Sequence, residues 1–150
     1  MVLQALVAYL HYVSILFTGM LLAYELILFR PELGVREARL LGRIDLLYFG
    51  SAMAILATGI LRMFWFGKGA EFYLANPLFY AKVGLFVAVA MLSIPPTLTF
   101  LRWRPGLAAG QAPLLTAAEV RRVRRFLHAE MGLFLLIPLP AALMARGIGL

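Results

Sequence analysis

The segment VLQALVAYLHYVSILFTGMLLAYELILF, residues 2–29, decides the fold. A helix rises about 1.5 Å per residue, so this almost wholly apolar segment is long enough to cross a hydrocarbon core roughly 30 Å thick. Similar segments follow at about residues 43–66, 77–101 and 116–146. The chain is 63% hydrophobic and 14% charged, far more apolar than a soluble domain needs. We therefore predict an all-α fold: one transmembrane domain over residues 1–150, arranged as an antiparallel four-helix bundle.

The first span begins beside the first residue of the chain, where a secretory signal peptide would also begin. It has no basic region before its apolar part. Glu25, Phe29 and Arg30 stand where a cleavage site would need small residues. We therefore expect the segment to remain in the protein as the first transmembrane helix.

Breaks in the apolar pattern set the expected limits of the other spans. Residues 30–41 resemble a short polar connection, and residues 67–76 an aromatic connection at the membrane interface. Asn76–Pro77 and Thr116–Glu119 have the residue types of helix N-caps. Prolines near the end of the third span should kink that helix or end it early, and prolines in the fourth should bend it.

Basic residues favour one end of the predicted bundle. Ten lie beside the connections between the first two and the last two spans: Arg30, Arg36, Arg39, Arg43, Arg102, Arg104, Arg121, Arg122, Arg124 and Arg125. Four lie on the other side: Arg62, Lys68, Lys82 and Arg146. Because basic residues beside spans are retained in the cytoplasm, both termini are predicted outside it. The net charge of +7 therefore indicates anionic lipid headgroups as partners, and we expect no nucleic acid.

The chain contains no Cys, which excludes disulfides, thiolate metal sites, Fe–S clusters and cysteine nucleophiles. It also lacks a phosphate-binding loop, a Ser/His/Asp series and an HExxH zinc motif. Redox chemistry in this protein would therefore need a bound cofactor.

The first span carries a polar stripe. Gln4, His11, Thr18 and Glu25 follow one another at seven-residue intervals and, with Ser14, lie on one face of a helix. Ionisable groups in hydrocarbon cost roughly 2.5–3.5 kcal/mol each on insertion scales, so this stripe should face protein. His11 is either a metal ligand or proton carrier, or a structural histidine bonded to a neighbouring helix.

The second span has a polar face of its own, with members three, four or seven residues apart: Asp45, Tyr48, Ser51, Thr58 and Arg62. Gly50 and Gly59 should allow a neighbouring helix to approach closely. Arg62 is expected either to serve a site or to anchor the helix among headgroups. For Asp45 we predict a simple ion pair with Arg43.

The third and fourth spans add three ionisable residues. Lys82 lies deeper than headgroup anchoring requires, on the same half of the bundle as His11, so the two could serve one site. His128 and Glu130 are two residues apart and therefore point about 200° apart around the helix axis. Glu130 shares the apolar face and is assigned to the interior, while His128 is assigned to the interface. A haem ligated by both His11 and His128 is the alternative.

Several motifs that together cover nearly the whole chain resemble an uncharacterised family of small bacterial four-helix membrane proteins. They are GRIDLLY (42–48), ATGILR (57–62), GKG (67–69), FYLANP (72–77) and SIPPT (93–97). This resemblance implies a multi-pass protein of the bacterial inner (plasma) membrane, and it carries no function with it.

A more distant likeness rests on LHYVS (10–14), AKV (81–83) and the segment 125–130. These resemble parts of HemJ-type protoporphyrinogen oxidases and of CopD-like copper-resistance membrane proteins. HemJ-type enzymes bind haem b and use a first-span His and a third-span Lys. The resemblance therefore implies these roles for His11 and Lys82.

The first functional hypothesis is a haem b-binding membrane protein with a redox role, either electron transfer or oxidation of a porphyrinogen. His11 would be the axial ligand of the haem iron, with His128 as a weaker candidate. The cofactor would be held by His11, Lys82, Tyr12 and Ser14. The catalytic or proton-handling groups would be Lys82, Arg62 and Glu130. If the protein is an enzyme, it is then an oxidoreductase, acting on a porphyrin or quinone-like substrate.

The second hypothesis is a small transporter or ion- or proton-handling membrane protein, with CopD-like copper handling included. Glu25, Asp45 and Glu130 gather in the half of the bundle away from the termini, where coupled carboxylates can hold a proton or a cation. A structural membrane protein with a satisfied polar core is the third alternative. Assembly as a homo-oligomer is compatible with all three.

Overall fold

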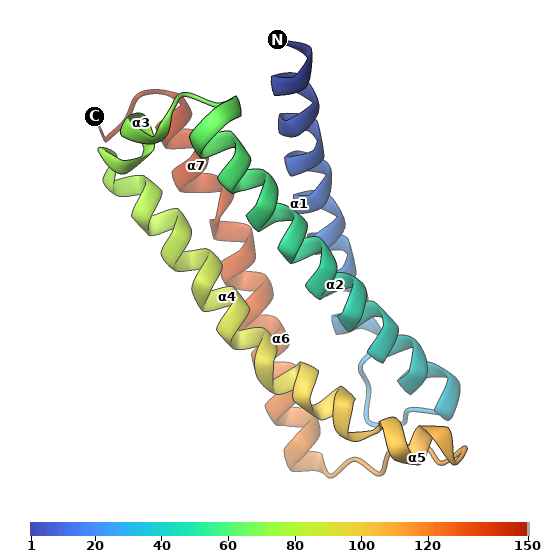
Figure 1. Ribbon diagram of the computed structural model, residues 1–150. Helices are drawn as coiled ribbons and strands as arrows, with labels where there is room; N and C mark the ends of the chain where they lie inside the picture. The colour runs from blue at the N-terminus through green and yellow to red at the C-terminus, as the bar shows by residue number, and fades with distance from the viewer. Residues whose placement is uncertain (150) are drawn as a thin grey trace.

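The computed structural model describes residues 1–149 and consists of helices joined by short connections (Figure 1). The elements are α1 (Val2–Leu28), α2 (Val35–Leu61), the π-helical turn η1 (Arg62–Phe66), α3 (Ala70–Leu74), α4 (Pro77–Arg102), α5 (Arg104–Ala108), α6 (Ala117–Leu136) and α7 (Pro138–Ala145). Four of the helical stretches are long and apolar enough to cross a membrane: Val2–Leu28, Val35–Phe66, Pro77–Ala108 and Ala117–Ala145. The predicted all-α four-span fold is confirmed.

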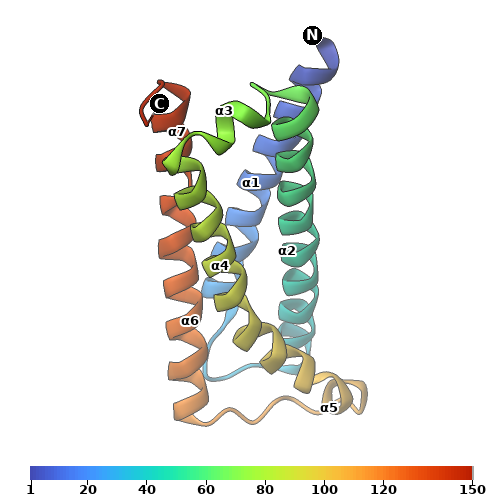
Figure 2. The same cartoon turned by 60° about the vertical axis from the view of Figure 1, so that its left-hand side comes forward.

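The spans run antiparallel, and both termini lie at the same end of the bundle (Figure 1). We call the other end, which holds α5 and the α1–α2 connection, the arginine-rich end, after the ten arginines named above. The most extensive contacts join α1 to α2 and α4 to α6, whereas α2 and α4 touch much less (Figure 2). The bundle is thus two helical hairpins packed against each other.

The surface and the interior of the bundle have opposite polarity to those of a soluble protein. Large apolar side chains are exposed along every span, among them Leu16, Phe49, Met91 and Leu135. Several polar side chains are buried instead: Thr18, Glu25, Asp45, Ser51, Asn76, Thr99 and Glu130. An apolar surface of this extent is stable against lipid and not against water. The protein is therefore a multi-pass membrane protein with an apolar surface along its spans and several polar side chains in its interior.

Helix α2 begins earlier than the sequence pattern predicts. We placed a polar connection over residues 30–41, but the helix starts at Val35. Glu37 accepts a hydrogen bond from the backbone N–H of Gly34 (2.8 Å) and pairs with Arg30, so it caps the first turn. Ala38, one turn into the helix, is already buried. The prediction was wrong because hydropathy marks where a helix enters hydrocarbon, and this helix begins outside it.

The prolines act differently in the two spans that contain them. Helix α4 does not end early, since it continues past Pro95 and Pro96 to Arg102. The fourth span is interrupted at Ile137, directly before Pro138, where α6 gives way to α7. Proline lacks the N–H that would donate to the carbonyl one turn back. Helix α4 continues without those hydrogen bonds, whereas the fourth span divides into two helices at its first proline.

Both predicted N-caps are confirmed. The Asn76 side chain accepts a hydrogen bond from the N–H of Leu78 (2.9 Å) at the start of α4. At the start of α6, Thr116 and Glu119 form a reciprocal capping box. The connection 67–76 is not a simple loop, because residues 70–74 form the short helix α3.

Candidate functional site

Helices α1 and α2 are joined by a ladder of polar pairs. His11 Nδ1 lies 2.9 Å from Thr58 Oγ1, and the Thr18 hydroxyl donates to Ser51 Oγ at 2.7 Å. Seven residues along α1 correspond to seven residues back along α2, as expected for two antiparallel helices in fixed register. One further step of seven leads to Glu25, which faces the region of Asp45 on α2. At His11, Thr18 and Glu25 the polar stripe of the first span therefore faces protein, as predicted, but its first member does not.

That first member is Gln4, which is exposed. The N-terminal turns of α1 project beyond the other helices, so they have no neighbour to face (Figure 1). Ser14 also makes no bond to another helix, because its hydroxyl donates to the Leu10 carbonyl of its own helix at 2.8 Å.

The third step of the ladder is a buried group of acidic side chains, which we call the carboxyl cluster: Glu25, Asp45 and Glu130. Glu25 is 2% exposed and Glu130 is 1% exposed. All three side chains are near enough for their charges to interact. The Tyr48 hydroxyl lies beside Glu130. Helices α1, α2 and α6 thus each send one carboxyl group to the same place in the interior.

Helix α4 completes the surroundings of the cluster. The Thr97 hydroxyl donates a hydrogen bond to Asp45 Oδ1 at 2.6 Å. A crevice of about 350 Å³ between α2 and α4 has a mainly apolar lining that includes Thr97, Tyr48 and Thr18. The crevice lies between α2 and α4, which make few contacts with each other. It therefore opens from the lipid-facing surface of the bundle toward residues that neighbour the carboxyl cluster.

Two oxygen atoms of the cluster have no partner. Oε1 of Glu25 and Oε1 of Glu130 are both buried and accept no hydrogen bond from any residue of the described chain. Within residues 1–149, none of the three carboxyl groups forms an ion pair, since Arg30–Glu37 is the salt bridge found there. Arg104 on α5 is the cation whose charge acts on Asp45. Unpartnered buried oxygens are rare and costly, so this arrangement calls for a functional explanation.

Apolar side chains enclose the cluster along the bundle axis. Leu22 lies one helical turn before Glu25 and Leu127 one turn before Glu130, and both are 0% exposed. Because α1 and α6 run in opposite directions, these leucines lie on opposite sides of the carboxyl groups. The carboxyl groups therefore have a buried apolar neighbour on each side along the bundle axis.

A second polar group lies in the half of the bundle that holds the termini. His11 is half-buried against α2, where a Cβ on Gly59 would lie 3.4 Å from His11 Cε1. The Arg62 guanidinium stacks 5.0 Å from the Tyr12 ring centre, and its Nη2 lies 3.5 Å from the Tyr12 hydroxyl. The charges of Arg62 and Lys82 reach the imidazole. We call His11, Tyr12, Arg62 and Lys82 the histidine site.

Two pairings considered in the sequence analysis are not formed within residues 1–149: the ion pair of Arg43 with Asp45, and His11 with His128. Arg43 is exposed, so the expected ion pair with Asp45 is wrong: two residues apart, they point to different sides of α2. His128 is exposed, and its Nδ1 lies 2.7 Å from the Arg124 carbonyl of its own helix. The structure does not bring His128 to His11, which faces α2. Glu130 lies in the interior, as predicted, and His128 is exposed. Its assignment to the membrane interface stays a prediction.

Some neighbours of the cluster escaped the sequence analysis. Thr97 could not be predicted as a partner, because a hydroxyl directly after a proline pair forms no periodic pattern. Arg104 was counted only as a loop charge. Across residues 1–149, no group of three or more His, Asp or Glu side chains has the geometry to hold a metal ion.

Comparison with known families gives one match. The model of the family described as "Predicted membrane protein (DUF2214)" matches residues 3–149. The chain belongs to this family. No curated protein and no solved structure matches the chain. The resemblance to an uncharacterised family of membrane proteins is therefore confirmed, and the likeness to HemJ-type and CopD-like proteins stays a prediction.

Proposed function

We propose that this protein binds and releases protons within the membrane, with the carboxyl cluster as the proton-binding site. One observation carries the proposal: two carboxyl oxygens, on Glu25 and Glu130, are buried in a four-helix interior without a partner. Charges in such surroundings are expensive, so neighbouring carboxyl groups share protons and exchange them as a unit. Carboxyl groups that served only to join helices would be fully hydrogen-bonded.

The residues around the cluster have suitable chemistry for proton exchange. The Tyr48 hydroxyl beside Glu130 can donate or accept, and Thr97 holds Asp45 in one orientation. Two hydrogen-bonded pairs of the ladder, His11–Thr58 and Thr18–Ser51, lie between the carboxyl cluster and the end of the bundle that holds the termini. Successive pairs are about 10 Å apart along α1, so water molecules have to bridge them during transfer.

A proton-flux measurement tests the proposal. The full chain is reconstituted in liposomes that enclose a pH-sensitive dye, and a pH gradient is applied. We expect wild-type vesicles to dissipate the gradient faster than empty vesicles, and Glu25→Gln and Glu130→Gln to remove most of that excess. Glu71→Gln is the matched control, since Glu71 is an exposed acid of α3.

Infrared spectroscopy gives an independent readout of the same site. Titration of the wild-type protein should change the carbonyl band of protonated carboxyl groups, and Glu25→Gln or Glu130→Gln should remove part of that change. Equal spectra for wild type and both variants, together with unaltered flux, would refute the proposal.

A second candidate function rests on a different observation, at the histidine site. Thr58 Oγ1 donates its proton to the Ala54 carbonyl at 2.5 Å, so it accepts from His11 Nδ1. This tautomer leaves the lone pair on Nε2, the state in which histidine ligates haem iron. Arg62 and Lys82 would pair with the two propionates.

Haem b bound there would supply electron transfer or substrate oxidation, as the first hypothesis expects. An absorption spectrum of the protein purified after expression with adequate haem tests this. A Soret band that is lost in His11→Ala supports the assignment, and absence of the band in the wild-type protein contradicts it.

A further inference from the structure

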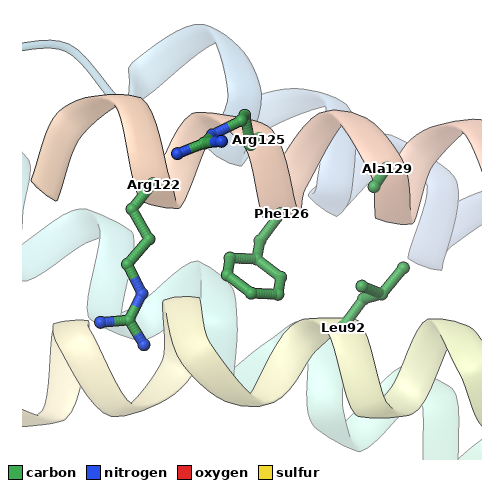
Figure 3. A pocket seen from close by; sticks show the side chains of 5 residues that line it. All are labelled: Leu92, Arg122, Arg125, Phe126 and Ala129. Carbon is green, nitrogen blue, oxygen red and sulfur yellow. The ribbon is translucent and has the colours of Figure 1, made fainter. Parts of the chain in front are cut away.

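A groove at the arginine-rich end lies between α4 and α6 and is independent of both sites above. Its volume is about 370 Å³, and it is lined by Leu92, Arg122, Arg125, Phe126 and Ala129 (Figure 3). Arg122 extends from α6 toward α4, and the Phe126 ring lies between the two helices (Figure 3). The groove therefore combines two cations with an apolar wall.

The two arginines are free to bind an anion. Among the described residues, neither the Arg122 nor the Arg125 side chain forms a hydrogen bond or ion pair. The nearest acid along the helix is Glu119, one turn before Arg122. Its carboxylate already accepts from the Thr116 backbone N–H at 3.1 Å and from the Thr116 hydroxyl at 3.0 Å. Within the described residues, Glu119 therefore forms no ion pair with Arg122 or Arg125.

The order of the lining residues along α6 matches the order of chemical groups in a phospholipid. The helix begins at Ala117, so Arg122 and Arg125 lie in its second and third turns, before the apolar part of the span. Phe126 and Ala129 follow toward the hydrocarbon, and Leu92 faces them from α4. From Arg122 to Ala129 the helix rises about 10 Å, enough for the upper part of one acyl chain.

We propose that this groove is a binding site for an anionic phospholipid. Arg122 and Arg125 bind the headgroup phosphate, for which the guanidinium fork is well suited, and one acyl chain lies against Phe126, Ala129 and Leu92. Basic pockets between membrane helices recognise headgroups by the same physical chemistry. A soluble anion would use only the arginines and leave the apolar wall without a role.

The chain provides a matched control for the charge. Arg121 and Arg124 are also exposed on α6, but they do not line the groove. The double variants Arg122→Gln/Arg125→Gln and Arg121→Gln/Arg124→Gln therefore have equal net charge. If the groove is the binding site, the two double variants should differ in how strongly they bind anionic lipid. If lipid is held by a diffuse basic surface, both should lose binding equally.

The test is native mass spectrometry of the detergent-purified full chain, titrated with phosphatidylglycerol or phosphatidylcholine of identical acyl chains. We expect the wild-type protein to prefer phosphatidylglycerol. Arg122→Gln/Arg125→Gln should weaken phosphatidylglycerol binding on the order of tenfold or more, and Arg121→Gln/Arg124→Gln should leave it within about twofold. Circular dichroism establishes that each variant is folded.

A third variant tests the apolar part without altering charge. Leu92→Trp should fill the groove and weaken binding of phosphatidylglycerol, and it serves as the deciding variant if an arginine variant does not fold. Equal losses in the two double variants, no headgroup preference, or unchanged binding in Leu92→Trp would each overturn the proposal. So would displacement of the lipid by millimolar inorganic phosphate, which would reduce the groove to a simple anion site.

Discussion

His11 and Glu25 belong to the same polar stripe of α1, yet the two halves of the bundle give them different surroundings. His11 is half-buried, bonded to Thr58 and close to the cations Arg62 and Lys82. Glu25 is enclosed, has an unpartnered oxygen and faces two other carboxyl groups. One half thus pairs its histidine with a hydroxyl, and the other gathers three acidic side chains, two of which have an unpartnered oxygen. Polar groups that only hold helices together resemble the first kind, so the second kind is the stronger sign of function.

The largest effect should come from opening the enclosed half. Leu127→Ala removes a fully buried side chain beside the carboxyl cluster and should lower the free energy of unfolding by about 2–5 kcal/mol. Leu135→Ala on the same fourth span, at a position 66% exposed, should change it by less than about 1 kcal/mol. Unfolding in detergent mixtures, followed by circular dichroism, measures both. Equal effects would mean that the cluster is not enclosed by tight packing.

A smaller loss of stability is expected when the hydrogen bond from α4 to the carboxyl cluster is removed. Thr97→Val leaves Asp45 buried without its hydroxyl partner and should cost about 1–3 kcal/mol. Ser93→Ala is the control, because Ser93 bonds only to the Ala90 carbonyl of its own helix. Thr97→Ser should restore most of the stability, and a Thr97→Val variant as stable as Ser93→Ala would contradict the assigned role.

At the histidine site, removing the hydroxyl that bonds to His11 should lower the free energy of unfolding by less. Thr58→Val removes the partner of His11 Nδ1 and should cost about 0.5–1.5 kcal/mol, since the half-exposed imidazole can find other partners. Thr58→Ser keeps the hydroxyl and serves as the control. Nitrogen NMR of the imidazole should show a changed tautomer balance only in Thr58→Val. A cost equal to that of Thr97→Val would remove the contrast between the halves.

The smallest effect on stability is expected from alanine substitutions at two glycines of α2, Gly59 and Gly50. A Cβ at Gly59 would lie 3.4 Å from His11 Cε1, so Gly59→Ala should shift the imidazole slightly and cost about 0.5 kcal/mol or less. At Gly50 no atom lies within 4 Å of the added Cβ, so Gly50→Ala should be neutral or stabilising by up to about 1 kcal/mol. The His11 NMR signals should move only in Gly59→Ala. Of the two positions predicted to allow close approach, only Gly59 has the imidazole beside it.

The features that could be predicted from the sequence are those with a regular pattern. Apolar length gives the four spans, and seven-residue spacing places His11, Thr18 and Glu25 on one face of α1. The rotation of about 100° per residue around a helix axis also shows that Glu130 and His128 point to different sides of α6. Each of these depends on one helix alone, so no knowledge of the neighbouring helices is needed.

Contacts between helices could not be predicted in the same way. The bond from Thr97 to Asp45 depends on how α4 rotates against α2, and the exposure of Arg43 corrects an ion pair proposed from proximity in sequence. The start of α2 at Val35 depends on a cap formed by Glu37, outside the apolar stretch that defined the span. Helix rotation and capping are set by side-chain geometry, which hydropathy does not contain.

The matched ladder between α1 and α2 has a consequence for how the chain enters the membrane during synthesis. As α1 emerges first, Thr18 and Glu25 have no partner, and a lone carboxylate in lipid is unfavourable by several kcal/mol. Stable insertion should therefore wait for α2, whose Ser51 and Thr58 arrive in register with Thr18 and His11. The hairpin, and not the single helix, is then the unit of insertion. Glu130 arrives with the fourth span, so the cluster is completed only by the last step of biogenesis.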